Sequence, residues 1–311
     1  MKPSAIRIDS LVKTFPKGFW RIPEKIIDGV SFEVHEGEAF GLVGHNGAGK
    51  TTLLKCLVGL LRPNQGKVLF FGDSELSVAV KQKIGFLPEQ PYFYDYLTGE
   101  EFLHLCANLF GIQGSERSQR VTALLEKVGL APFKDRLLRS YSKGMLQRIG
   151  IAQALINQPP LLILDEPMSG LDPVGRKEIR DLILDLKRRG TTILLSSHIL
   201  YDVEVICDRI GFLVAGKMTY CGPLKSLMEG KVKAYEVWVS GVEPQRLQKI
   251  SGVPVERSVE LGEWLVRMEN LNNVNVVIDD IRKNGGKILS LTPVRESLEE
   301  IYSEQVRSMM K

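Results

Sequence analysis

The sequence is poor in the features that mark a metal-binding, secreted or membrane-spanning chain. Its four cysteines, Cys56, Cys106, Cys207 and Cys221, are scattered over 311 residues without a C-x-x-C pair, so neither a zinc site nor a disulfide framework is indicated. No apolar stretch approaches the roughly 20 residues of a membrane-spanning helix, and the first residues lack the apolar core of a signal peptide. We therefore expect reduced thiols, a cytoplasmic location, and membrane contact only through a partner.

An excess of either charge is also missing. Lys and Arg number 41 against 37 Asp and Glu, a formal net charge of +4, and no basic block stands out. This balance predicts no nucleic-acid partner. A weak positive charge would suit work near an anionic membrane surface, but ordinary solvated surface charge explains it better. Repeats and low-complexity segments are absent too, so the length indicates two ordinary globular domains.

What the sequence does contain is a phosphate-binding P-loop. The apolar run Ala39–Val43 precedes G-x-x-x-x-G-K-T, and apolar residues at helical spacing follow, which is the strand, loop and helix order that the motif requires. Its glycines let backbone N–H groups converge on an anion at a helix N-terminus. Lys50 can then reach the β- and γ-phosphates, and the Thr51 hydroxyl can bind Mg²⁺. The loop residues are Gly44, His45, Asn46, Gly47, Ala48, Gly49, Lys50 and Thr51, followed by Thr52. We predict that the chain binds a nucleoside triphosphate.

Two later apolar runs end in polar side chains. One ends in Asp165 and Glu166, and the other ends in His198. Such runs are typical of buried parallel strands whose carboxyl ends meet at a site, and the alternation of strands with helices predicts a parallel sheet covered by helices. Because a carboxylate pair is costly to bury without a cation, we expect both acids near the bound nucleotide.

The remaining segments suggest how the chain is divided. Residues 5–13 and 26–34 are predicted strands of a small sheet, and a Pro/Gly-punctuated loop at 15–23 separates them. Residues 99–130 show helical periodicity, which predicts an inserted helical subdomain. Beyond a boundary near Gly230, the order strand, helix, strand, strand, helix, strand resembles a ferredoxin-like unit, and an amphipathic helix closes the chain.

From residue 6 to residue 227 these motifs stand in the order of an ATP-binding cassette, and the chain resembles the ATPase subunit of an ABC transporter. The resemblance implies that Asp165 holds Mg²⁺ through water, and that Glu166 polarises the attacking water. It implies that His198 senses the γ-phosphate, and that Ser169–Asp172 is the D-loop, with Asp172 as its last residue.

The segment YSKGM at residues 141–145 stands where the family has its LSGGQ signature. Ser142 and Gly144 are retained, while Lys143 and Met145 depart from the consensus. In the family this segment binds the γ-phosphate of the ATP held by a second cassette, through a serine hydroxyl and N–H groups at a helix N-terminus.

Two assignments stay open at this point. In the family a glutamine directly follows the strand and its proline, but here Glu89 stands in that place and Gln90 comes one residue later. Either could approach Mg²⁺, with a slight preference for Gln90. Phe15 matches the position of the adenine-stacking aromatic residue, with Trp20 as the alternative, although an aromatic residue here could simply pack on the sheet.

We therefore predict an α/β fold. Residues 1–230 form a P-loop NTPase ABC cassette with a RecA-like parallel sheet core, a small antiparallel β-subdomain, and a helical subdomain at about 90–157. Residues 231–311 form a small α+β accessory domain of ferredoxin-like order, for which dimerisation or bracing of the cassette is the expected role.

The predicted function is hydrolysis of Mg-ATP to ADP and phosphate. The resemblance implies that two such cassettes dimerise head to tail around two ATP molecules, and that this dimer drives a separately encoded integral membrane permease at the cytoplasmic face of the cell membrane. The ending SLEEIY at residues 297–302 resembles that of ABC-2 exporters, which favours export. One alternative is an ABC ATPase that acts on ribosomes or DNA, which a single cassette without a long coiled coil disfavours. A second is a non-hydrolysing regulatory cassette, which the complete set of Lys50, Asp165, Glu166 and His198 disfavours.

Overall fold

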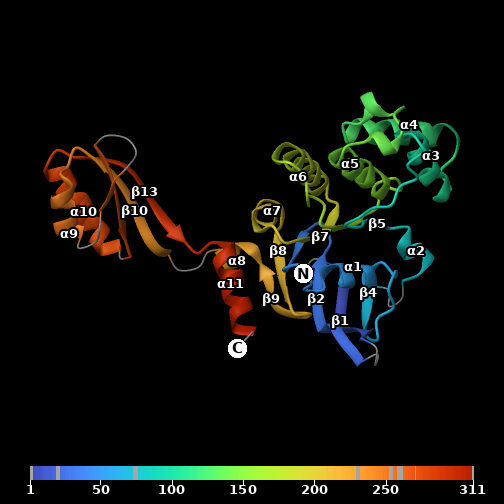
Figure 1. Ribbon diagram of the computed structural model, residues 1–311, viewed down its shortest axis with the longest axis horizontal. Helices are drawn as coiled ribbons and strands as arrows, with labels where there is room; N and C mark the ends of the chain where they lie inside the picture. The colour runs from blue at the N-terminus through green and yellow to red at the C-terminus, as the bar shows by residue number, and fades with distance from the viewer. Residues whose placement is uncertain are drawn as a thin grey trace. The chain divides into compact units, whose positions relative to one another are not determined.

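A computed structural model describes residues 3–18, 22–72, 76–228, 232–251, 255–257, 262–269 and 271–309. The chain divides into two compact units, of which the first comprises Met1–Leu224 together with Ser308–Lys311, and the second spans Lys225–Arg307. In Figure 1 the first unit runs from blue to yellow, and the second is orange to red.

The centre of the first unit is a six-stranded sheet of order β5-β6-β7-β3-β8-β9. Its strands are β3 (Ala39–Val43), β5 (Ile84–Leu87), β6 (Leu161–Asp165), β7 (Thr192–Ser197), β8 (Arg209–Val214) and β9 (Lys217–Pro223). All residues of β3, β6 and β7 are buried, as expected for parallel strands covered on both faces. The strand and helix pattern therefore predicted these three strands correctly.

The sheet is mixed, whereas the sequence predicted a parallel one. Strand β9 pairs antiparallel with β8, because only Ala215 and Gly216 connect them. Both connecting residues have positive φ angles, 46° and 76°, as two-residue hairpin turns require. So short a connection can join only antiparallel strands, since a parallel crossover needs a dozen or more residues.

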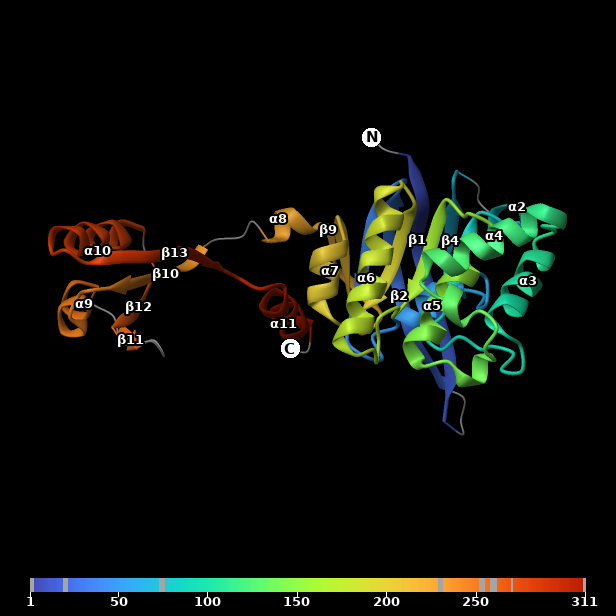
Figure 2. The same ribbon diagram turned by 90° about the horizontal axis from the view of Figure 1, so that it is seen from above.

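Four helices of the first unit accompany this sheet. They are α1 (Lys50–Leu57), α5 (Lys143–Ala154), α6 (Pro173–Arg188) and α7 (Leu200–Ile206). Helix α7 packs against β3, β7 and α6, and Figure 2 shows α6 and α7 side by side. The predicted P-loop helix is α1, and its buried residues Leu53, Leu54 and Leu57 contribute to the hydrophobic core that it shares with Phe40 and Leu42 of β3.

A second, antiparallel sheet has the order β2-β1-β4, with β1 (Ser4–Lys17), β2 (Ile22–His35) and β4 (Gln65–Phe70). The loop expected at residues 15–23 is wrong for Phe15, because β1 continues to Lys17 and Phe15 pairs with Glu24. Pro16 lies opposite Pro23, so both missing N–H donors fall at one level of the hairpin, where they disrupt pairing least. Trp20 lies outside the described residues.

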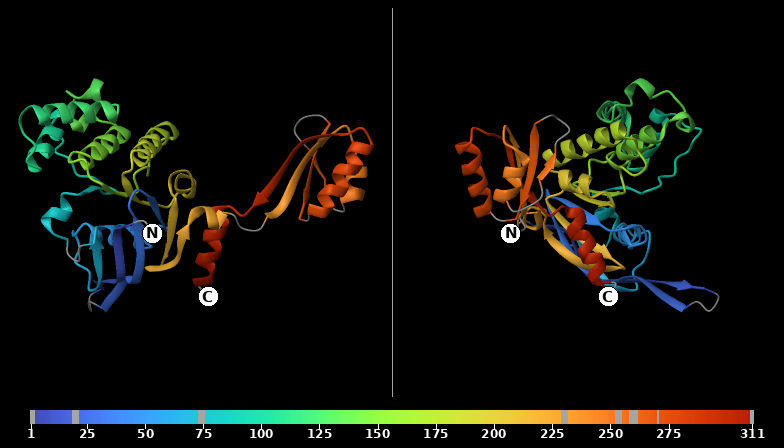
Figure 3. Two further views of the ribbon diagram at one scale, coloured as in Figure 1. Left: turned by 180° about the vertical axis from the view of Figure 1, so that it is seen from behind. Right: turned by 60° about the vertical axis from the view of Figure 1, so that its left-hand side comes forward.

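The helical subdomain contains α3 (Gly99–Leu109) and α4 (Gly114–Lys127), with the 3-10 turns Ala131–Phe133 and Leu138–Ser140 leading to α5. A capping box starts α3, in which Thr98 and Glu101 bond to each other's backbone N–H groups. In Figure 3, α3, α4 and α5 gather together, away from the blue strands β1, β2 and β4. The short helix α2 (Val78–Lys81) precedes β5.

The second unit contains a four-stranded antiparallel sheet of order β11-β12-β10-β13. Its elements are α8 (Leu224–Met228), β10 (Val232–Ser240), α9 (Pro244–Ser251), β11 (Val255–Arg257), β12 (Glu263–Met268), α10 (Leu271–Lys283), β13 (Lys287–Arg295) and α11 (Leu298–Met309). Val237, Leu247, Val266 and Val277 form its core, between the sheet and helices α9 and α10. The predicted alternation of strands and helices is confirmed. Across the described part of the chain, no helix is both long and apolar enough to span a membrane.

Candidate functional site

The glycine-rich loop between β3 and α1 is held by close backbone contacts. Gly49, at the N-cap of α1, has φ 104°, and a Cβ atom there would lie 2.9 Å from the Ile26 carbonyl oxygen. A Cβ atom on Gly44 would lie 2.6 Å from the Leu213 carbonyl oxygen. The Gly216 N–H group donates to the Ala48 carbonyl oxygen at 3.1 Å. The end of β8, the β8–β9 turn and strand β2 therefore enclose the loop.

Lys50 turns its ammonium group back into this loop. Its Nζ atom donates to the Gly44 carbonyl oxygen at 2.6 Å and to the His45 carbonyl oxygen at 3.3 Å, and the side chain is only 6% exposed. Nζ also lies 3.1 Å from Oε1 of Glu166. This contact is an ion pair without good hydrogen-bond geometry, since Oε1 has no hydrogen-bond partner in the described chain. The loop thus holds a buried cation where phosphates would bind.

The two carboxylate residues at the end of β6 are buried and have different hydrogen-bond partners. Asp165 has no exposed surface, and its Oδ1 accepts a 2.7 Å hydrogen bond from the Ser196 hydroxyl. Burial raises the pKa of Asp165, while the hydroxyls of Ser196 and Thr51 lower it less strongly. Glu166 has φ 49°, a strained angle for this residue type, and its N–H group donates to the Ser196 oxygen at 2.9 Å.

His198 completes a chain of polar contacts across three neighbouring strands. Its Nδ1 lies 2.8 Å from Oε2 of Glu166, and its side chain is 37% exposed. Glu166 therefore joins the Lys50 ammonium on one carboxylate oxygen to the His198 ring on the other. Strands β6, β7 and β3 are adjacent and parallel, so their carboxyl ends bring together three residues far apart in the sequence.

A cavity of about 630 Å³ opens beside these groups. Its lining residues are Phe15, Ile26, His45, Asn46, Gly47, Gly49, Lys50, Thr51, Thr52, Glu89 and Glu166. The Lys13 ammonium lies 4.9 Å from the centre of the Phe15 ring. Among the described residues, Glu89 lines the cavity and Gln90 does not. Glu89 also lies close enough to Asp165 for its charge to raise that carboxyl's pKa.

Ser142, Gly144 and Asp172 are not among the described residues that line this cavity. Ser142 caps α5 and accepts the Met145 N–H group at 3.3 Å. Asp172 caps α6 and accepts the Gly175 N–H group at 2.7 Å. The Lys143 ammonium lies against Gly170, where a Cβ atom would overlap it. These residues form a separate surface in which Ser142 and Asp172 are exposed.

The residues next to the P-loop fit a magnesium ion. Oδ2 of Asp165 is buried without a hydrogen-bond partner in the described chain, and the Thr51 hydroxyl lies near that carboxylate. No group of three or more His, Cys, Asp or Glu residues suited to a metal exists in the described ranges. One hydroxyl and one carboxylate suit Mg²⁺, which is usually held by few protein ligands together with water and substrate phosphates.

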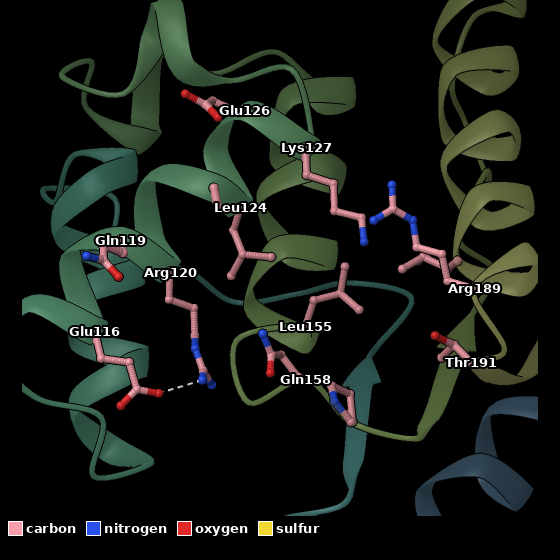
Figure 4. A pocket seen from close by; sticks show the side chains of 13 residues that line it. Glu116, Gln119, Arg120, Leu124, Glu126, Lys127, Leu155, Gln158, Arg189 and Thr191 are labelled. Atoms are coloured by element: carbon pink, nitrogen blue, oxygen red, sulfur yellow. Dashed lines mark hydrogen bonds and ion pairs between the residues drawn. The ribbon is translucent and has the colours of Figure 1, made fainter.

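A larger cavity of about 820 Å³ lies elsewhere, between α4 and the ends of α5 and α6. Figure 4 shows Lys127 and Arg189 extending toward each other across it, with Arg120 paired to Glu116. Burial and the Arg189 charge lower the pKa of Lys127. The P-loop, Asp165, Glu166 and His198 are absent from its described lining, and Asp185 already pairs with Arg189 at 2.8 Å. Its size alone therefore does not make it the candidate site.

Ser196 is the site residue that the sequence analysis missed. It lies on β7, directly opposite Asp165 on β6, and has no exposed surface. Its signal in the sequence is weak: a polar residue where the buried run Ile193, Leu194, Leu195 ends, two positions before His198.

Comparisons with known proteins agree with this geometry. The family profile described as ABC transporter matches residues 27–169. An uncharacterized ABC transporter ATP-binding protein of Nostoc sp. is 44% identical over 310 residues, which cover 98% of this chain and 90% of the relative. The bacitracin transport ATP-binding protein BcrA of Bacillus licheniformis is 35% identical over 289 residues, or 90% of each chain.

Among solved structures, the ATP-binding cassette MJ0796, as a post-hydrolysis dimer bound to ADP and Pi, matches with a TM-score of 0.64 and 26% identity. The match covers 70% of this chain and 98% of that one.

Proposed function

The chain belongs to the ATP-binding subunits of ABC transporters, which hydrolyse ATP to energise transport, and from that premise we propose that it works as a head-to-tail dimer driving export through a separately encoded integral membrane permease. The observation that carries the proposal is the contact chain from Lys50 through Glu166 to His198, at 3.1 and 2.8 Å, beside the P-loop cavity.

In this proposal the P-loop binds the phosphates of ATP. The N–H groups of residues 44–52 surround the β- and γ-phosphates, and Lys50 exchanges its contact with Glu166 for phosphate oxygens. Phe15 stacks on the adenine with the ring face opposite Lys13, because the Lys13 ammonium lies over the other face, 4.9 Å from the ring centre.

Thr51 and Asp165 would hold Mg²⁺, with Asp165 acting through water and its unpartnered Oδ2 facing the ion. The ion, when bound, offsets the negative charge that develops on the phosphate oxygens. As the third protein group near Mg²⁺ we propose Glu89 in preference to Gln90. Glu89 lines the cavity, and its carboxylate is close enough to Asp165 for its charge to raise the pKa of that residue.

Glu166 is proposed to orient and polarise the attacking water, since a carboxylate released from Lys50 can accept a proton from it. His198 holds that carboxylate through Nδ1 at 2.8 Å and keeps its other ring nitrogen for the γ-phosphate. Burial of Glu166, which is 6% exposed, strengthens both interactions.

Dimerisation would bring residues of a second protomer to the nucleotide cavity of the first. Ser142, Gly144 and Asp172 are proposed to contact the ATP held by the other protomer, with N–H groups at the start of α5 facing its γ-phosphate. Their location away from the chain's own cavity supports this arrangement.

The permease would dock on the helical subdomain, at the cytoplasmic face of the cell membrane. Tyr92, Tyr94 and Tyr96 are 91%, 47% and 65% exposed, and such aromatic clusters are common at the centre of protein interfaces. The likeness to a bacitracin transport ATP-binding protein supports a role in transport, and the SLEEIY ending at residues 297–302 favours export.

We propose that residues 231–311 form a ferredoxin-like domain that follows the cassette of residues 1–230 in the chain. Support comes from the order β10-α9-β11-β12-α10-β13 along the chain, and from the sheet order β11-β12-β10-β13. Bracing of the cassette or dimerisation is its proposed role.

The test is size-exclusion chromatography of the Glu166→Gln variant with and without Mg-ATP. We expect a monomer without nucleotide and a dimer with it, because blocked hydrolysis should preserve the ATP-bound dimer. A variant that binds ATP yet stays monomeric, or one that is dimeric in both conditions, would contradict ATP-driven dimerisation. Steady-state ATP turnover at the wild-type rate would contradict the role of Glu166.

A further inference from the structure

A single buried hydroxyl contacts both carboxylate residues of the candidate site. Ser196 Oγ donates to Asp165 Oδ1 at 2.7 Å and accepts the Glu166 N–H group at 2.9 Å. A serine hydroxyl has one donor and two acceptor positions, so one hydroxyl can make both bonds at once. The parallel register that pairs Asp165 with Ser196 brings the three groups together.

The bond to Glu166 supports a strained backbone. Glu166 has φ 49°, in the left-handed region that a glutamate rarely adopts. Its N–H group is buried, and within the described chain it bonds to the Ser196 side chain rather than to a backbone oxygen. The Ser196 oxygen satisfies this donor, and so helps to keep the Glu166 side chain between Lys50 and His198.

The bond to Asp165 selects between its two oxygens. Because Oδ1 is occupied by the serine proton, Oδ2 is the oxygen left without a hydrogen-bond partner among the described residues. A carboxylate fixed in this way presents one defined oxygen rather than two interchangeable ones. Contacts of this kind orient metal-binding side chains in many proteins.

We propose that Ser196 is a positioning residue for ATP hydrolysis, whose one hydroxyl fixes Asp165 for the metal and Glu166 for the attacking water together. The inference rests on the proposed function, because it assumes those roles for the two acids. It assigns to Ser196 no contact with ATP, so the loss of the hydroxyl should affect metal binding and turnover, and not the binding of nucleotide without metal.

The experiment compares Ser196→Ala with Ser196→Thr, which restores a hydroxyl, and with the control Thr192→Val. Thr192 is a second buried hydroxyl on β7, 2% exposed, and it bonds the Gly37 N–H group at 2.9 Å, at the other end of the strand. Two measurements are made on each full-length variant: the kcat and KM for ATP, and the binding of Mn²⁺ in the presence of ADP by electron paramagnetic resonance. ADP affinity in EDTA is the nucleotide control.

For Ser196→Ala we expect kcat and Mn²⁺ affinity to fall by about 10- to 100-fold, the range seen when a partner of a metal ligand is removed. ADP affinity in EDTA should change by less than about twofold. Ser196→Thr should recover most of both losses, and Thr192→Val should match the wild type. Ser196→Ala with wild-type kcat and Mn²⁺ affinity would overturn the inference, as would equal losses in Thr192→Val.

Two further comparisons keep the result decisive. If Ser196→Ala does not fold, Ser196→Cys replaces it, because a thiol keeps the volume but donates weakly; wild-type behaviour of Ser196→Cys would then overturn the inference. Glu166→Gln is measured in parallel. If Glu166→Gln turns over ATP normally, the proposed function fails, whereas an inactive Glu166→Gln beside an unaffected Ser196→Ala rejects the role of Ser196 alone.

Discussion

The ion pair between Lys50 and Glu166 makes a quantitative prediction about stability. Both side chains are 6% exposed, and their charged atoms lie 3.1 Å apart. At an effective dielectric constant of about 20, such charges attract by about 5 kcal/mol, which the desolvation of both groups offsets in part. Removing one partner leaves the other buried and uncompensated, which typically costs about 3–5 kcal/mol.

We expect Lys50→Met to lower the free energy of unfolding by about 3 kcal/mol, at the lower end of that range. His198 remains 2.8 Å from the other Glu166 oxygen, so the stranded carboxylate keeps one polar partner. Adding Glu166→Gln to Lys50→Met should restore about 1–3 kcal/mol, because the uncompensated charge is then gone.

Urea unfolding of the wild type, both single variants and the double variant, without nucleotide, measures this coupling. Lys50→Arg is the matched control, since it retains a cation. Additive effects of the two substitutions would refute the idea that the pair acts as a unit. In parallel, ATP binding by Lys50→Ala should fall severely, and retained normal affinity would refute the role of the P-loop.

Three further predictions follow from other parts of the chain. Phe15→Ala should weaken ATP binding by about 1–3 kcal/mol, the usual worth of base stacking on an aromatic ring, and an unchanged Kd measured by isothermal titration calorimetry would exclude Phe15. Thr98→Ala removes the capping box of α3 and should lower the free energy of unfolding by about 1 kcal/mol, as measured in urea against a Ser118→Ala control. Burial raises the pKa of Cys106 to about 12 and also raises those of Cys56, Cys207 and Cys221, but of the four only Cys221 is exposed, so native protein at pH 8 should react with Ellman's reagent slowly at one thiol and denatured protein at four. Because a raised pKa means that the folded state holds its proton more tightly, the contribution of Cys106 to stability should be complete below its ordinary pKa of 9.0 and decline toward pH 12.

The sequence was most informative where chemistry and periodicity coincide. The P-loop, Asp165, Glu166 and His198 could be found because each follows a short apolar run, and parallel strands bring such ends together. The C-terminal elements were also predictable, since their alternation is regular.

Other features depend on pairing partners that are distant in the chain. The extension of β1 past Phe15 requires Glu24 opposite it, and prolines nearby pointed to a loop. The choice between Glu89 and Gln90 depends on a turn of one residue, which decides which side chain lines the cavity. Ser196 acts through hydrogen bonds to two residues of another strand, and a serine carries no such information by itself.

The close packing of the phosphate loop also limits how far it could be transplanted. The octapeptide owes its shape to carbonyl oxygens of Ile26 and Leu213, which lie within 2.9 Å of where side chains on Gly49 and Gly44 would begin, and to the Gly216 N–H group that binds Ala48. A designer who grafts only residues 44–51 onto another strand and helix would therefore transfer the sequence of the loop without the surrounding backbone that fixes its shape. The portable module consists of three separate pieces of chain: the loop, the end of β8 with the β8–β9 turn, and the segment of β2 around Ile26.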